Sequence, residues 1–159
     1  MKTKTKTKGF SVIEIIVALA IILTVVIFIS NLMNLYFKFT QRVGYKTQAA
    51  VLAEEASEAI LIIRDMGWIE NIDSLSEGAN YYIDFEDGEY FATSTPIVID
   101  GTLSRTIVIE PVYRDENDSI VESGTEDTNT KKATITISRV SDGYVFSESK
   151  LLIHNIHNN

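Results

Sequence analysis

The sequence predicts an α+β protein in which one long N-terminal helix packs on an antiparallel β-sheet head. The 20 residues from Phe10 to Ile29 are apolar except for a few small polar residues and one charge, Glu14. An amphipathic pattern follows with no proline, and after Gly67 the chain changes to short segments of β-branched and aromatic residues separated by turn residues. A length of 159 residues suits a single globular body, so we expect one head plus what the N-terminus adds.

The first 35 residues predict a basic leader followed by a membrane-spanning half-helix. Residues 1–9 alternate lysine with threonine and end at Gly9, which leaves nothing that can form a core. In residues 10–35, twenty helical residues would rise roughly 30 Å, the thickness of a hydrocarbon core. Four lysines precede this segment and the next basic residue is Lys38, so the positive-inside rule places the N-terminus in the cytoplasm and the head outside.

Residues 36–66 predict the amphipathic half of the same helix. Apolar residues recur there at spacings of three and four, as expected of a helix that lies on a core. Those residues are Tyr45, Ala49, Leu52, Ala56, Ala59 and Ile63. We expect the helix to end near Met66, with Gly67 as its C-cap.

Residues 67–159 predict a β-rich extracytoplasmic head with exposed loops near 67–80 and 114–130. The candidate strands are NYYIDF, EYFAT, PIVID, LSRTIVIEPVY, KATITISRV and GYVFSESKLLI. Asp142-Gly143 predicts a hairpin turn before the last of them. We expect aromatic residues to fill the space between helix and sheet, namely Trp68, Tyr81, Tyr82, Tyr90, Phe91, Tyr113, Tyr144 and Phe146.

Composition excludes several kinds of chemistry. From Val51 onward the chain has 7 basic and 21 acidic residues, a net charge of −14 that disfavours nucleic-acid binding. The absence of cysteine excludes disulfides, thiol nucleophiles and zinc-thiolate sites. No nucleophile elbow or phosphate loop occurs, so we predict neither enzymatic activity nor a cofactor.

Two segments carry part of a metal-binding pattern, and neither predicts a metal site. His154 and His157 lie three residues apart, but the tail that holds them has no carboxylate to complete a site. The run from Asp115 to Ser119 begins like a calcium loop, yet Ile120 stands where a turn glycine is needed, and a solvated hairpin tip explains the same residues. Lys131 and Lys132 are the only adjacent basic pair in the head and the one candidate for a local basic patch.

The stretch from Lys8 to Glu14, read as KGFSVIE, resembles the class III signal sequence of type IV prepilins and type II secretion pseudopilins. The resemblance implies a pilin-like fold, cleavage between Gly9 and Phe10 by a prepilin peptidase, and N-methylation of Phe10. It also implies that Glu14 pairs with the N-terminal amine of a neighbouring subunit during assembly. Two features depart from many pilins: the segment from Thr24 to Leu35 lacks a proline, and no disulfide can close the head.

The function that this resemblance implies is that of a structural subunit, a minor pilin or pseudopilin of a type IV pilus-like or type II secretion-like filament. Its expected partners are the prepilin peptidase, other pilin subunits, the inner-membrane assembly platform and, before assembly, the lipid bilayer. Its expected location is the cytoplasmic membrane and then an extracytoplasmic or cell-surface filament. Two alternatives stay open: a single-pass anchored binding module that does not polymerise, and a tip pilin whose head binds DNA or a surface.

Overall fold

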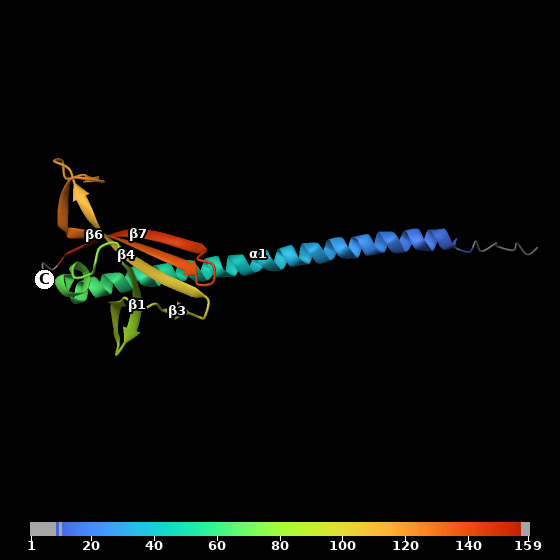
Figure 1. Cartoon of the computed structure of the whole chain (residues 1–159), viewed down its shortest axis with the longest axis horizontal. Helices are drawn as coiled ribbons and strands as arrows, with labels where there is room; N and C mark the ends of the chain where they lie inside the picture. The colour runs from blue at the N-terminus through green and yellow to red at the C-terminus, as the bar shows by residue number, and fades with distance from the viewer. Residues whose placement is uncertain (1–8, 10, 157–159) are drawn as a thin grey trace, which may run out of the picture. The chain divides into compact units, whose positions relative to one another are not determined.

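A computed structural model describes Gly9 and residues 11–156 of the chain (Figure 1). A single long helix, α1 (Val12–Met66), is followed by a short π-helix, η1 (Ile69–Asp73), and seven β-strands. The chain divides into two compact units, Met1–Val43 and Gly44–Asn159, which are described in turn. The predicted α+β class, a long apolar N-terminal helix with an antiparallel sheet, is confirmed.

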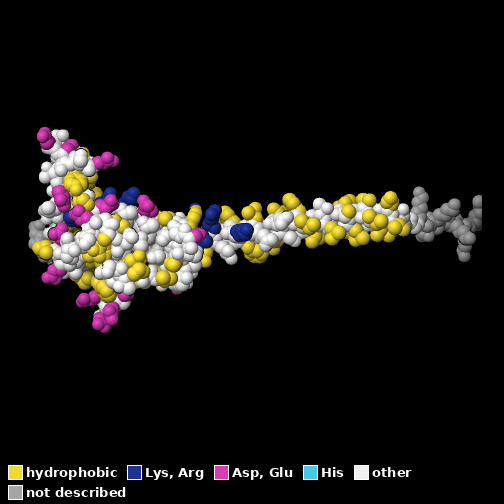
Figure 2. Space-filling view, viewed as in Figure 1, with side chains coloured by type: hydrophobic (Ala, Val, Ile, Leu, Met, Phe, Trp, Pro, Cys, Tyr) yellow, Lys and Arg dark blue, Asp and Glu magenta, His cyan; other side chains and the backbone are white. Residues whose placement is uncertain are grey.

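The first unit contains the apolar part of α1. Its first turn forms on the carbonyl of Ser11, which accepts hydrogen bonds from the backbone N–H groups of Glu14 at 3.0 Å and Ile15 at 3.2 Å. The large apolar side chains of this part are all exposed, from 75% at Val12 to 45% at Val43 (Figure 2). By length and composition, α1 is the one helix in the described part of the chain that could cross a membrane.

The second unit begins with the amphipathic part of α1, which packs on the sheet as predicted. The buried residues of α1 are Ala49, Ala53, Ala56, Ala59, Ile60 and Ile63. Four of the six are alanines, and small side chains let a helix backbone lie close to the layer that it covers. Tyr45 and Leu52 pack at the border of the same core.

The C-terminal end of α1 is confirmed at Met66, with Gly67 directly after it, but Gly67 does not take the left-handed conformation that is common at helix ends. Gly67 is not among the glycines with positive φ, and its N–H donates to the carbonyl of Arg64 at 3.2 Å. The chain instead continues through Trp68 into η1 because Trp68 and Ile72 bury their side chains in the core. The segment 67–80 is therefore partly a core element rather than an exposed loop.

All strand pairs in the sheet are antiparallel, and β2-β1-β4-β6-β7 is the main strand order. The two short strands β3 and β5 pair with β4. The bounds are β1 (Asn80–Glu86), β2 (Glu89–Thr93), β3 (Val98–Ile99), β4 (Leu103–Arg114), β5 (Ile120–Val121), β6 (Thr125–Arg139) and β7 (Val145–His154). Each predicted strand is present, although PIVID is reduced to the two residues of β3. The predicted turn at Asp142-Gly143 is also confirmed, with Gly143 at φ +70°.

The core lies between α1 and the alternating inward faces of β4 and β6. On β6, Ala133, Ile135 and Ile137 are buried, whereas Thr134 and Thr136 are only half-buried. The prediction that the aromatic residues fill this core is mostly wrong. Trp68 alone among them is fully buried, because small and branched aliphatic side chains already fill the narrow space between the layers.

The segment 114–130 is exposed as predicted, but it is not a long irregular connection. Strand β5 and the first residues of β6 lie within it, and both pair with the end of β4. Arg114 pairs with Ile120 on one side and with Thr125 on the other. Turn-forming residues hide this pairing in the sequence, because Asp and Asn are depleted in strands and Glu is depleted to a lesser degree.

Candidate functional site

The N-terminal motif that resembles a processing signal lies only partly within the described residues. Gly9 is exposed, and a Cβ atom added there would meet no other atom within 4 Å. Phe10 and residues 1–8 are outside the described residues, and so is the bond between Gly9 and Phe10. A larger residue at Gly9 would therefore meet no steric obstacle from the described chain, and a requirement for glycine would have to come from another protein.

Glu14 lies exposed in the first turn of α1. A carboxylate in the first turn interacts favourably with the positive end of the helix dipole and with N–H groups that have no partner in the helix. It borders a shallow hollow whose other residues are apolar, namely Ile15, Ala18, Leu19 and Ile22. No other acidic residue occurs before Glu54, so Glu14 is the one negative charge of the apolar part of α1.

Two hydroxyl groups in the apolar part of α1, those of Thr24 and Ser30, are satisfied by the helix itself. Thr24 Oγ1 donates to the carbonyl of Ala20 at 2.8 Å, and Ser30 Oγ donates to the carbonyl of Val26 at 2.9 Å. Such bonds to the preceding turn let a hydroxyl stay in an environment without water. This part of the helix is therefore suited to a lipid or helix-bundle environment.

In the head, Arg114 holds together the hairpin formed by β4 and β6. Its Nε donates to Asp127 Oδ2 at 2.7 Å, and its Nη1 donates to the carbonyl of Asp118 at 2.9 Å. Hydrogen bonds from Thr130 and Arg114 lower the pKa of Asp127 and keep it ionised. The backbones are also close here, because a Cβ atom at Gly124 would collide with the carbonyl oxygen of Arg114.

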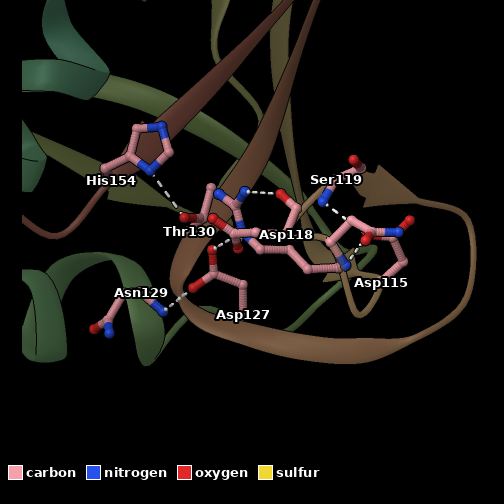
Figure 3. Close-up of polar contacts among 9 residues, drawn as sticks. Asp115, Asp118, Ser119, Asp127, Asn129, Thr130 and His154 are labelled. Carbon is pink, nitrogen blue, oxygen red and sulfur yellow. Dashed lines mark hydrogen bonds and ion pairs between the residues drawn. The ribbon is translucent and has the colours of Figure 1, made fainter.

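The acidic run considered as a calcium loop uses its oxygens within the hairpin (Figure 3). Asp115 Oδ1 accepts the N–H groups of Asn117 and Ser119, each at 2.9 Å. Asp118 lies 3.5 Å from Arg114 Nε and is paired with it. Among the described residues, no group of three or more His, Asp or Glu side chains is arranged to hold a metal ion.

Lys131 is the centre of an ion cluster that sequence reasoning missed. Its side chain is only 7% exposed, and its Nζ lies 2.9 Å from Glu77, 3.2 Å from Glu126 and 3.7 Å from Asp73. Burial by itself would lower the pKa of Lys131, but its hydrogen bonds to Glu77 and Glu126 and their charges outweigh burial and raise it. Lys132 pairs with Glu110 at 3.0 Å, so Lys131 and Lys132 do not form a basic patch.

Arg105 is a second buried cation that the sequence could have indicated. It is 8% exposed on the inward face of β4, and its Nη1 lies 3.1 Å from Glu55 on α1. Strand alternation places it on the same face as Leu103 and Ile107, both buried. The same alternation places Lys131 on the buried face of β6 together with Ala133. The two-residue alternation of the strands therefore indicates, from the sequence alone, that both cations face the core.

Of the two histidines, His154 ends β7 and His157 lies outside the described residues. His154 Nδ1 is 2.8 Å from Thr130 Oγ1, the hydroxyl beside Asp127 (Figure 3). This histidine therefore belongs to the polar network of the hairpin. Comparison of the chain with protein-family models, with curated proteins and with solved structures finds no match.

Proposed function

We propose that this chain is a structural subunit, a minor pilin or pseudopilin, that is processed by a prepilin peptidase and polymerised through its N-terminal helix. The observation that carries the proposal is Glu14 in the first turn of an exposed apolar helix, five residues after Gly9. A carboxylate in such a helix costs a few kcal/mol to insert into a bilayer, so a tolerated one usually has a partner or a task. In this proposal its partner is the N-terminal amine of a neighbouring subunit.

The exposure of the apolar part of α1 supports the same proposal. Between Ile15 and Phe37 no charged residue occurs, and the large apolar side chains of this segment stand exposed. Lipid covers such a surface before assembly, and the helices of other subunits cover it afterwards. The head then lies outside the cytoplasmic membrane, and the chain carries no catalytic activity.

The mass of the mature N-terminus tests this function. We expect protein isolated from its native envelope to begin at methylated Phe10, and to keep its lysine-rich leader when the cognate peptidase is deleted. Gly9→Leu should also keep the leader, because the described chain has room for the side chain and the obstacle would lie in the peptidase. An intact leader in the presence of active peptidase would instead favour the single-pass anchored module.

A further inference from the structure

One end of the head exposes a group of apolar side chains, here named the valine tip. Its members are Val98 at 50% exposure, Val140 at 52%, Tyr144 at 38% and Val145 at 47%. They belong to β3 and to the segment that joins β6 to β7, and Figure 1 shows the turns after β3 and after β6 at the same end of the sheet. The strand register agrees, because Ser104 pairs both with Val98 and with Ser138, and Ser138 pairs with Val145.

Hydrogen bonds hold the two turns of the valine tip to each other and to α1. The N–H of Val140 donates to the carbonyl of Thr102 at 3.0 Å. Gln48 Nε2, on α1, donates to Asp100 Oδ2 at 2.9 Å. The apolar side chains of the tip are therefore displayed on a bonded frame, and they stay exposed although the core of the same unit lies beside them. Exposed apolar groups of this kind mark contacts with proteins or membranes.

Arg139 and three aromatic rings lie directly beside the valine tip. The guanidinium carbon of Arg139 is 5.2 Å from the centre of the Phe146 ring and 5.8 Å from the ring centre of Tyr45. It is also 5.8 Å from the ring centre of Tyr144. Tyr45, on α1, stacks on Phe146 with the ring centres 5.4 Å apart. Arginine and tyrosine combine an apolar body with a polar end, which is the combination that membrane–water interfaces favour.

The valine tip is poor in negative charge compared with the rest of the head. Ten of the 21 acidic residues after position 50 lie in residues 80–90 and 114–130, and Figure 2 shows acidic side chains gathered on the projecting parts of the head. The two turns of the tip contain only Asp100 and Asp142, and Asp142 lies 3.5 Å from Arg139, which neutralises it. An anionic membrane surface repels the acidic hairpins and accepts this end of the head.

The chain connects the valine tip to the predicted membrane span through a short piece of α1. No charged residue occurs between Ile15 and Phe37, and Tyr45 follows eight residues later, which is about 12 Å of helix. Gly44 stands at the boundary of the two units, where a glycine weakens the helix relative to alanine. Because the connection is this short, the bilayer that contains α1 is the apolar phase within reach of the tip.

We propose that the valine tip rests on the lipid headgroups of the bilayer that contains α1, before the chain leaves that bilayer. Val140 and Val145 enter the edge of the hydrocarbon, and Tyr144 lies at the level of the headgroups. Lys46, which is exposed on α1 beside Tyr45, faces the lipid phosphates. The proposal rests on the membrane span of the proposed function but not on polymerisation, so it applies equally to a single-pass anchored chain.

Quenching by lipid tests the contact in the full-length chain, because the natural chain has no cysteine and one can be introduced for a fluorophore. Val140→Cys is compared with Ile120→Cys on β5, where the native side chain is equally exposed at 51%. Both are placed in vesicles of phosphatidylethanolamine and phosphatidylglycerol that contain lipid spin-labelled at the headgroup. We expect the label at position 140 to be quenched at least about twofold more than the label at position 120. Equal quenching would overturn the contact.

A series of protein-to-lipid ratios distinguishes the bilayer from a second copy of the chain as the surface that covers the tip. Contact with lipid does not depend on the density of the protein, so the difference in quenching should persist when the protein is diluted about tenfold into lipid. A difference that disappears on dilution would show that a second copy covers the valine tip, and it would overturn the proposal.

A charge substitution separates apolar contact from mere nearness to the membrane. With the fluorophore at Val98→Cys, Val140→Glu should lower the equilibrium constant for contact about tenfold, because a charge replaces an apolar side chain at the lipid surface. Ile120→Glu is the matched control and should leave the quenching at Val98→Cys unchanged. Both native side chains are half exposed, so neither substitution disturbs the core. Unchanged quenching in Val140→Glu would overturn the contact.

Two measurements keep this proposal distinct from the filament function. Flotation with the vesicles reports the membrane span, and a chain that does not float would overturn both proposals. The mass of the N-terminus in the native envelope reports processing. A retained leader together with selective quenching at position 140 would overturn only the filament function, and a mature N-terminus at Phe10 without selective quenching would overturn only the lipid contact.

Discussion

Lys131 illustrates at the scale of one residue how this head compensates for the absence of disulfides. Its ammonium group joins Asp73 and Glu77, from the segment 67–80, to Glu126 on β6. Its raised pKa means that protonated Lys131 contributes fully to stability below its unfolded-state pKa, wherever its carboxylate partners are ionised. That contribution is lost only as the pH rises through the higher folded-state pKa, above 10.5.

Replacing Lys131 by methionine should lower the free energy of unfolding by about 2–4 kcal/mol, because three neighbouring carboxylates lose their common cation. Lys150→Met is the matched control, since Lys150 is 59% exposed and its pair with Glu148 is worth about 0–1 kcal/mol. Urea unfolding of the full chain in detergent, followed by circular dichroism, measures both. Equal losses for the two variants would show that buried Lys131 and its exposed carboxylate partners contribute no more than a surface pair.

At the scale of an element, the alanines of α1 determine how closely the helix lies on the sheet. Ala49, Ala56 and Ala59 are at most 1% exposed, and they belong to the same buried core as Ala133, Ile135 and Ile137 of β6. The three-and-four spacing in the sequence predicted this face of the helix correctly. The sequence did not predict that the aromatic side chains would stay largely outside it, since the distance between the layers depends on both surfaces.

A larger side chain on this face should separate the layers. Ala56→Leu should lower the free energy of unfolding by about 1–3 kcal/mol through overpacking, despite the good helix propensity of leucine. Ala50→Leu is the control, because Ala50 is exposed on the same helix and the substitution there should change stability by less than about 0.5 kcal/mol. Thermal unfolding of both variants separates them, and an equal effect would contradict close packing at Ala56.

At the scale of the whole molecule, the two units differ in whether the chain itself covers their apolar side chains. The head contains its own core, whereas the apolar part of α1 has none and exposes residues such as Leu23, Phe28 and Phe37. The apolar side chains of such a helix are removed from water only in a bilayer or among other helices. Glu14 is the charged group at the beginning of that segment, and the role that we propose for it belongs to the assembly rather than to the isolated chain.

Glu14→Ala should leave processing at Gly9 largely intact and reduce incorporation into filaments, because in the proposed assembly the new N-terminal amine would lose its carboxylate partner in a low-dielectric bundle. Glu54→Ala removes an exposed acid from the head half of the same helix and serves as the control. Immunoblots of the membrane and filament fractions measure processing and incorporation separately. Normal incorporation of Glu14→Ala would count heavily against the assembly role of this carboxylate.

The sequence by itself determined the helix that ends at Met66, the strands and the alternation along β6, because each depends on local periodicity and turn chemistry. Only the tertiary structure decided the conformation at Gly67, where burial of Trp68 and Ile72 carries the chain into η1 instead of a loop. It also decided the strand pairing of residues 120–126 and the partners of Lys131 and Arg105. These features depend on residues up to 54 positions apart, whose distances in space no local pattern contains.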